Sequence, residues 1–85
     1  MRKEVIKMFV NRETIINAIH IIAPLVTCER LPNNQLTLVF KGYRHEDFLY
    51  DSEIRYLENG GLPMDKLSFI LVDVLNFAAE SGYKI

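Results

Sequence analysis

The clearest pattern of apolar positions lies in the last quarter of the chain, between Leu62 and Gly82. Apolar residues recur there three or four positions apart, the spacing of a helix face, over about four turns. They are Leu67, Ile70, Leu71, Val74, Leu75, Phe77 and Ala78. Pro63 suits the first turn of a helix and Gly82 suits its end. The pattern predicts a closing helix that packs one face on a core.

A second helical pattern follows Asn11, a typical N-cap residue, with Glu13 in the first predicted turn. One face of this helix consists of isoleucines at helical spacing: Ile15, Ile19 and Ile22. Pro24 predicts that the helix ends by Ile22 or Ala23, because proline removes a backbone donor and clashes with the preceding turn. Isoleucine has only modest helix propensity, so we expect this helix to depend on packing.

The middle of the chain reads as a β-hairpin. Segments 25–31 and 35–41 flank the turn residues Pro32, Asn33 and Asn34. In the second segment Leu36, Leu38 and Phe40 alternate with residues that point the other way. Gly42 ends this strand, and residues 43–47 are expected to form a polar connection.

Segment 47–58 fits two structures. Its residues alternate with a period of two, with one face made of Phe48, Tyr50, Ser52, Ile54 and Tyr56, and this alternation favours a half-buried strand. A helix is the alternative, because Tyr50, Ile54 and Leu57 also share a helical face. Residues 4–10 also fit two structures. They fit a strand with Ile6, Met8 and Val10 on one face, or the first turns of a helix.

Together these elements predict one small α+β domain over residues 1–85: a helix, a three-stranded antiparallel meander and a closing helix, with an extra N-terminal strand as one alternative. The order of elements resembles that of the double-stranded RNA-binding fold. Domains of that family carry a lysine-rich start to the last helix. Here the corresponding residues are Pro63, Met64, Asp65 and Lys66. The resemblance is therefore one of element order, and we predict no membership of the family.

Charge is distributed unevenly along the chain. Residues 1–45 carry seven basic and three acidic side chains, a balance of +4, and residues 46–85 carry three basic and eight acidic ones, a balance of −5. Such asymmetry can steer a partner or favour self-association. The simpler interpretation is that the two halves fold together and their fields partly cancel.

The residues that carry chemistry are few. The single cysteine, Cys28, cannot form an intramolecular disulfide, which indicates a reducing compartment and predicts a cytoplasmic protein. No apolar run is long enough for a signal peptide or a membrane span. His20, His45 and Cys28 lack the spacing of zinc ligands, and we find no nucleotide-binding loop. We expect no cofactor, no metal and no enzymatic activity.

Two groups of residues are candidates for contact with a partner. On the closing helix, Phe69 and Val72 lie outside the apolar stripe, and Phe69 falls on the side shared with Asp73. We predict that they belong to an interface, unless segment 48–57 wraps around and covers them. Tyr50 and Tyr56 join this group because tyrosine is frequent at protein interfaces.

The second group is the densest cluster of ionisable residues: Arg44, His45, Glu46 and Asp47. A solvated turn is the favoured explanation of the cluster, and polar contact with a partner is the alternative. His45 beside a carboxylate is a candidate general base, but no nucleophile lies next to it in the sequence.

These observations predict a small non-enzymatic protein-interaction or regulatory module, acting as a homodimer or by docking on a larger protein. An inhibitor of the phage or mobile-element type fits that description. The alternative is nucleic-acid binding through the basic first half, using Arg2, Lys3, Lys7, Arg12, Lys41 and Arg44. We consider it less favoured, because the basic patch that dominates nucleic-acid affinity is not evident. An enzyme active as an oligomer around His45 is the third hypothesis.

Overall fold

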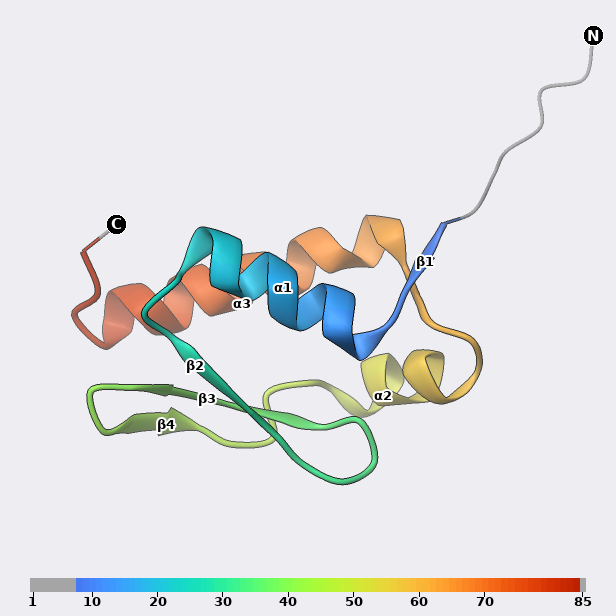
Figure 1. Cartoon of the computed structure of the whole chain (residues 1–85), viewed down its shortest axis with the longest axis horizontal. Helices are drawn as coiled ribbons and strands as arrows, with labels where there is room; N and C mark the ends of the chain where they lie inside the picture. Colours follow the sequence, from blue (N-terminus) through green and yellow to red (C-terminus); the bar gives the residue numbers. More distant parts are fainter. Residues whose placement is uncertain (1–7, 85) are drawn as a thin grey trace, which may run out of the picture.

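Residues 8–84 are described by a computed structural model of the chain (Figure 1). The elements are β1 (Phe9–Val10), α1 (Arg12–Ile22), β2 (Thr27–Arg30), β3 (Leu36–Phe40), β4 (Tyr43–His45), α2 (Asp51–Glu58), β5 (Leu62–Pro63) and α3 (Met64–Glu80). The strands β2, β3 and β4 form an antiparallel meander, and α1 and α3 lie together on one side of it (Figure 1). This confirms the predicted α+β fold of a helix, a three-stranded meander and a closing helix.

The core lies between the meander and the two long helices. Leu36, Leu38 and Phe40 of β3 are buried, as their alternation predicted. From the helices come the isoleucines of α1 and the apolar stripe of α3, buried at Ile15, Ile16, Ile19, Leu67, Ile70, Val74, Phe77 and Ala78. Among residues 8–84, no helix has the length and apolar character needed to cross a lipid bilayer.

The first helix begins and ends where its sequence signals predicted. The Asn11 side chain accepts a hydrogen bond from the backbone N–H of Thr14 at 2.9 Å, and the helix ends at Ile22 before Pro24. Polar contacts then tie α1 to the first hairpin. The Arg12 guanidinium donates to the Leu31 carbonyl at 2.8 Å, and Arg30 of β2 donates to the Glu13 carboxylate at 3.0 Å.

Segment 47–58 is helical over α2, so the prediction of a strand there was wrong. The third strand of the meander is instead β4, in the segment we expected to be a polar connection. Lys41 and Gly42 both have positive φ, 48° and 82°, and Phe40 pairs with Tyr43 across them. This is the geometry of a two-residue hairpin turn, which returns the chain to β3 at once. The strand therefore forms before segment 47–58 begins.

Long-range contacts then determine the structure of the segment that follows β4. Phe48 and Leu49 are buried in the connection to α2, and Ile54 and Leu57 of α2 pack against the core. These contacts bury the helical face that contains Ile54 and Leu57, and so favour the helix over the strand. At the start of α2, the Glu53 carboxylate accepts a hydrogen bond from the Tyr50 N–H at 2.7 Å.

The predicted N-terminal strand is present in part. Phe9 and Val10 form β1 and pair antiparallel with Pro63 and Leu62 of β5. Residues 4–7 of the predicted segment lie outside the described residues. The β1–β5 pair connects the start of α1 to the start of α3, because Val10 precedes the N-cap of α1 and Pro63 is the N-cap residue of α3.

Gly61 allows β1 and β5 to approach closely, and its replacement tests this contact. Gly61 has φ of 127°, and a Cβ atom there would lie 3.0 Å from both Phe9 Cβ and the Val10 carbonyl oxygen. We expect Gly61→Ala to destabilise the protein by about 2 kcal/mol through backbone strain and steric clash together. Chemical denaturation measures the loss.

Gly60→Ala is the matched control. Gly60 also has positive φ, 110°, but a Cβ there meets no described atom within 4 Å. It should therefore show only the backbone strain, about 1 kcal/mol. Equal losses in the two variants would show that the close approach to β1 contributes nothing to stability.

Candidate protein-interaction site

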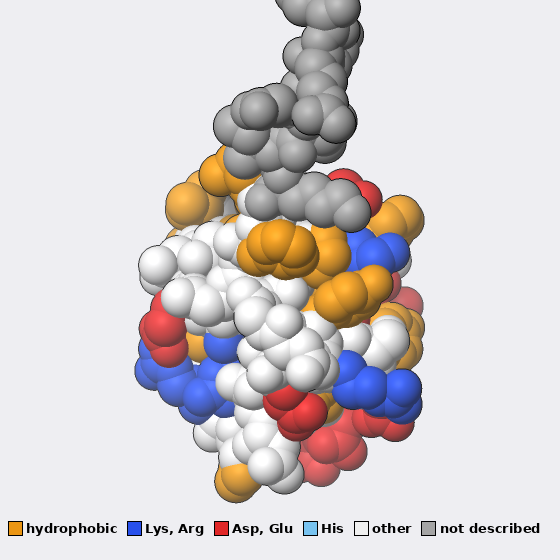
Figure 2. Space-filling view, turned by 90° about the vertical axis from the view of Figure 1, so that its right-hand side faces the viewer, with side chains coloured by type: hydrophobic (Ala, Val, Ile, Leu, Met, Phe, Trp, Pro, Cys, Tyr) orange, Lys and Arg blue, Asp and Glu red, His pale blue; other side chains and the backbone are white. Residues whose placement is uncertain are grey.

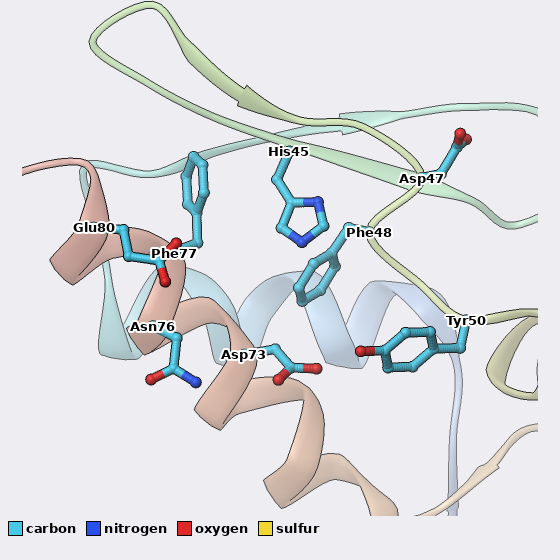
Figure 3. Close-up of a pocket in the computed structure, with 8 residues that line it drawn as sticks. All are labelled: His45, Asp47, Phe48, Tyr50, Asp73, Asn76, Phe77 and Glu80. Atoms are coloured by element: carbon cyan, nitrogen blue, oxygen red, sulfur yellow. The ribbon is translucent and has the colours of Figure 1, made fainter.

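A pocket of about 200 Å³ opens between α3 and the segment that joins β4 to α2 (Figure 3). Its lining consists of His45, Asp47, Phe48, Tyr50, Asp73, Asn76, Phe77 and Glu80. The pocket brings together residues from both groups of sequence candidates: His45 and Asp47 from the ionisable cluster, and Tyr50 and Asp73 from the interface group. Asp73 is more than twenty residues from His45, Asp47 and Tyr50 in the chain, so the packing of α3 beside β4 brings them together.

Aromatic rings form the inner wall of the pocket. His45 lies opposite Leu38 on the helix-facing side of the sheet. Its ring meets Phe48 edge-on, with centroids 5.5 Å apart, and lies 6.0 Å from the ring of Phe77. Phe48 and Phe77 are buried, so their rings also belong to the core behind the pocket. The Nδ1 atom of His45 is 3.2 Å from the Glu46 carbonyl oxygen, which orients the imidazole.

Carboxylates and an amide on α3 form the opposite side. Asp73, Asn76 and Glu80 are spaced by three and four residues and therefore share a helix face. Figure 3 shows the Tyr50 hydroxyl directed towards the Asp73 carboxylate, whereas Asp47 points outward and lies at the rim. Within residues 8–84, none of the three carboxylates that line the pocket takes part in an ion pair.

The electrostatic effect of these carboxylates reaches Glu53 in the first turn of α2. Burial raises the pKa of Glu53, the hydrogen bond from the Tyr50 N–H opposes that rise, and the negative charge of Asp73 adds to it. The negative charge of Asp73 therefore reaches Glu53, and a cation bound beside Asp73 would offset it.

Two residues of the ionisable cluster, Arg44 and His45, point to opposite faces of the sheet. Arg44 and His45 lie in β4, not in a solvated turn as predicted, and adjacent strand residues point to opposite faces. Arg44 pairs with Glu29 of β2 at 2.8 Å and with Glu46 at 3.3 Å. Arg44 therefore connects β4 to β2 within the meander, whereas the side chain of His45 points towards the helices. Arg44 and Glu46 do not line the pocket.

The interface candidates on α3 are exposed. Phe69 is 66% exposed and Val72 is 53% exposed, so segment 48–57 does not cover them. Tyr50 is similarly exposed and Tyr56 less so. Phe69 lies one helical turn before Asp73, which places an exposed aromatic side chain directly beside the pocket.

Exposed apolar side chains also occur where β1 pairs with β5: Met8, Phe9 and Met64. The Met64 N–H donates to the Met8 carbonyl at 2.9 Å, so these residues are neighbours. Figure 2 shows this end of the molecule, where apolar side chains gather in the upper part of the view.

Two residues considered for chemistry, Cys28 and His20, lie outside the pocket. Cys28 is half-buried in β2, and burial raises the pKa of its thiol to about 11, with Arg30 acting in the opposite direction. The thiol is therefore protonated and unreactive at neutral pH. His20 is exposed in the last turn of α1. Among the described residues, no three histidine, cysteine or carboxylate side chains are grouped to hold a metal ion.

Four lining residues were missed by the sequence analysis as site residues: Phe48, Asn76, Phe77 and Glu80. Asn76 and Glu80 were detectable, because they share a helix face with Asp73. Phe77 was assigned to the core stripe, and it serves both roles. Phe48 carried no signal, since its position depends on where the chain turns after β4.

Comparison of the chain with protein-family models, curated proteins and solved structures found no significant match.

Proposed function

We propose that this protein is a small interaction or regulatory module without catalytic activity, which docks through the outer face of α3 and the start of α2 onto another protein chain. The observation that supports this most is the exposure of Phe69 and Val72 beside a pocket lined with unpaired carboxylates. The other chain is a second copy of this protein or a larger partner. An inhibitor of the phage or mobile-element type remains within this proposal.

The composition of this face suits protein recognition. Interfaces are enriched in aromatic residues at their centre and carry polar groups around them. Phe69 and Tyr50 supply exposed aromatic area, and Asp73, Asn76 and Glu80 supply polar groups next to it. Exposure of a large aromatic side chain to water is unfavourable, so its burial against another protein stabilises the complex.

The basic first half lends less support to nucleic-acid binding. Among the described cations, Arg12 donates to backbone carbonyls, Arg30 pairs with Glu13 and Arg44 pairs with Glu29. These guanidinium groups are held by the protein itself, and phosphate would have to compete for them. For its location we propose the cytoplasm, because the only cysteine of the chain is a free thiol.

The proposal is tested by absolute mass from light scattering over a concentration series, on the wild type and on Phe69→Asp. A charge in place of Phe69 should dissociate a dimer into folded monomers, because an unpaired carboxylate is costly inside an interface. If the wild type is monomeric, the same pair of proteins is used as bait in extract of the source cells. A specific partner should then bind the wild type and be lost with Phe69→Asp.

Leu25→Asp is the matched control. Leu25 is 70% exposed, close to the value for Phe69, but it follows α1 and lies outside the proposed face. It should leave the mass and the partner unchanged, and circular dichroism checks that both variants fold. The proposal is overturned if the wild type is monomeric and binds no protein from the extract that Phe69→Asp fails to bind. It is also overturned if Phe69→Asp and Leu25→Asp change the mass or the bound protein equally.

A further inference from the structure

We propose that the pocket between β4 and α3 receives the guanidinium group of an arginine side chain on the partner protein. The inference rests on the proposed function and adds the chemistry of the contact. Figure 3 shows the arrangement that supports it: the imidazole of His45 and the ring of Phe48 on one side, and Asp73, Asn76 and Glu80 along α3 on the other.

The charge of this half of the protein favours a basic ligand over an acidic one. From residue 47 onward the described chain has seven carboxylates: Asp47, Asp51, Glu53, Glu58, Asp65, Asp73 and Glu80. None of them takes part in an ion pair within residues 8–84, whereas Glu13, Glu29 and Glu46 all do. Among the described residues, no lysine or arginine lines the pocket. An anionic ligand would be repelled, and a neutral one would leave the repulsion between Glu53 and Asp73 in place.

The aromatic wall favours arginine over other cations. A guanidinium is planar, stacks on aromatic faces and donates in a fork that suits carboxylates. Phe48, Phe77 and Tyr50 line the pocket and offer apolar contact for the arginine stem as well. Asp73 and Glu80, two turns apart on α3, and the Asn76 carbonyl between them provide acceptors for several N–H groups. An Nδ1–H of His45 that donates to Glu46 leaves Nε2 as a further acceptor.

Other ligands fit the pocket less well. A metal ion lacks three grouped ligands among the described residues. A lysine ammonium is strongly hydrated and compact, so it gains less from an aromatic wall. The cavity of about 200 Å³ is wide enough for a side-chain head group with part of its stem, and too small for a drug-sized molecule.

The test uses the acetylated and amidated peptide Gly-Gly-Arg-Gly-Gly, followed by backbone amide NMR shifts of the full chain. The same peptide with citrulline in place of arginine is the neutral isostere, and a lysine peptide separates stacking from charge. We expect saturable shifts confined to residues 45–50 and 73–80, with binding about tenfold weaker for citrulline because a charge-assisted contact is lost. The lysine peptide should bind more weakly than the arginine peptide.

Variants locate the binding. Asp73→Asn should weaken binding of the arginine peptide about tenfold, and the double variant with Glu80→Gln should remove saturation. Glu58→Gln, at the exposed end of α2 and outside the pocket, removes the same charge and should change the affinity less than twofold. Shifts spread over the whole acidic surface, equal binding of citrulline, or equal effects of Asp73→Asn and Glu58→Gln would overturn the inference.

The two proposals fail separately. If Phe69→Asp dissociates a protein complex but the arginine peptide does not bind in the pocket, the assignment of arginine is wrong and docking through α3 stands. If the wild type forms no complex that depends on Phe69, the proposed function is wrong, whatever the peptide does.

Discussion

Replacement of Gln35 with leucine is expected to lower the free energy of unfolding by about 3 kcal/mol, because three buried backbone groups lose their hydrogen-bond partner. Gln35 is 8% exposed and precedes β3. Its side-chain oxygen accepts from the N–H groups of Leu36 and Leu49, both at 2.8 Å. Its Nε2 donates to the Leu49 carbonyl at 2.9 Å.

The expected loss is large for a chain of this length. An unsatisfied buried donor or acceptor costs roughly 1–3 kcal/mol, and water entry will compensate in part, so the estimate for three groups stays near 3 kcal/mol. An 85-residue protein is typically stable by roughly 4–13 kcal/mol. Gln35→Leu therefore removes a substantial share of the total, although it adds apolar surface to a buried position.

Urea denaturation followed by circular dichroism measures this effect. Thr27→Val is the control, because Thr27 is an exposed residue of β2 in the same meander and should change stability by less than about 0.5 kcal/mol. A loss below 1 kcal/mol for Gln35→Leu would show that the amide contacts are dispensable.

The role of Gln35 explains why the sequence predicted α1, the hairpin and α3, but not the structure of segment 47–58. The first three carry local signals, such as the cap at Asn11, the stop at Pro24 and the glycine after α3. Segment 47–58 had two compatible periodicities. Residues outside the segment select the helix. They are the Lys41–Gly42 turn and Gln35, which binds Leu49 just before α2 begins.

The candidate site divides in the same way. The exposed character of Phe69 and the helical neighbourhood of Asp73 follow from the 3.6-residue period of a single helix. That His45 turns towards α3 while Arg44 turns away depends on β4 being a strand, which the sequence analysis did not predict. The pocket itself is a product of tertiary packing, since its residues come from two segments, 45–50 and 73–80, that are far apart in the chain.

Replacement of Ile19 with alanine is expected to destabilise the protein by about 3 kcal/mol, because it leaves a cavity where α1 packs on the core. Ile19 is fully buried at the centre of the isoleucine stripe. Alanine has the higher helix propensity, so the local effect of the substitution is favourable by a few tenths of a kcal/mol. The loss of packing is therefore slightly larger than the net loss, and the net loss tests the prediction that this isoleucine-rich helix depends on its contacts.

Ile21→Ala provides the control on the same helix. Ile21 lies two residues further along α1 and is 80% exposed, so the same atoms are removed without creating a cavity. We expect no loss, or a gain of a few tenths of a kcal/mol from helix propensity. Thermal and urea denaturation of both variants give the difference. Similar values for the two would mean that α1 does not pack through the face containing Ile15 and Ile19, and the placement of the core would then be wrong.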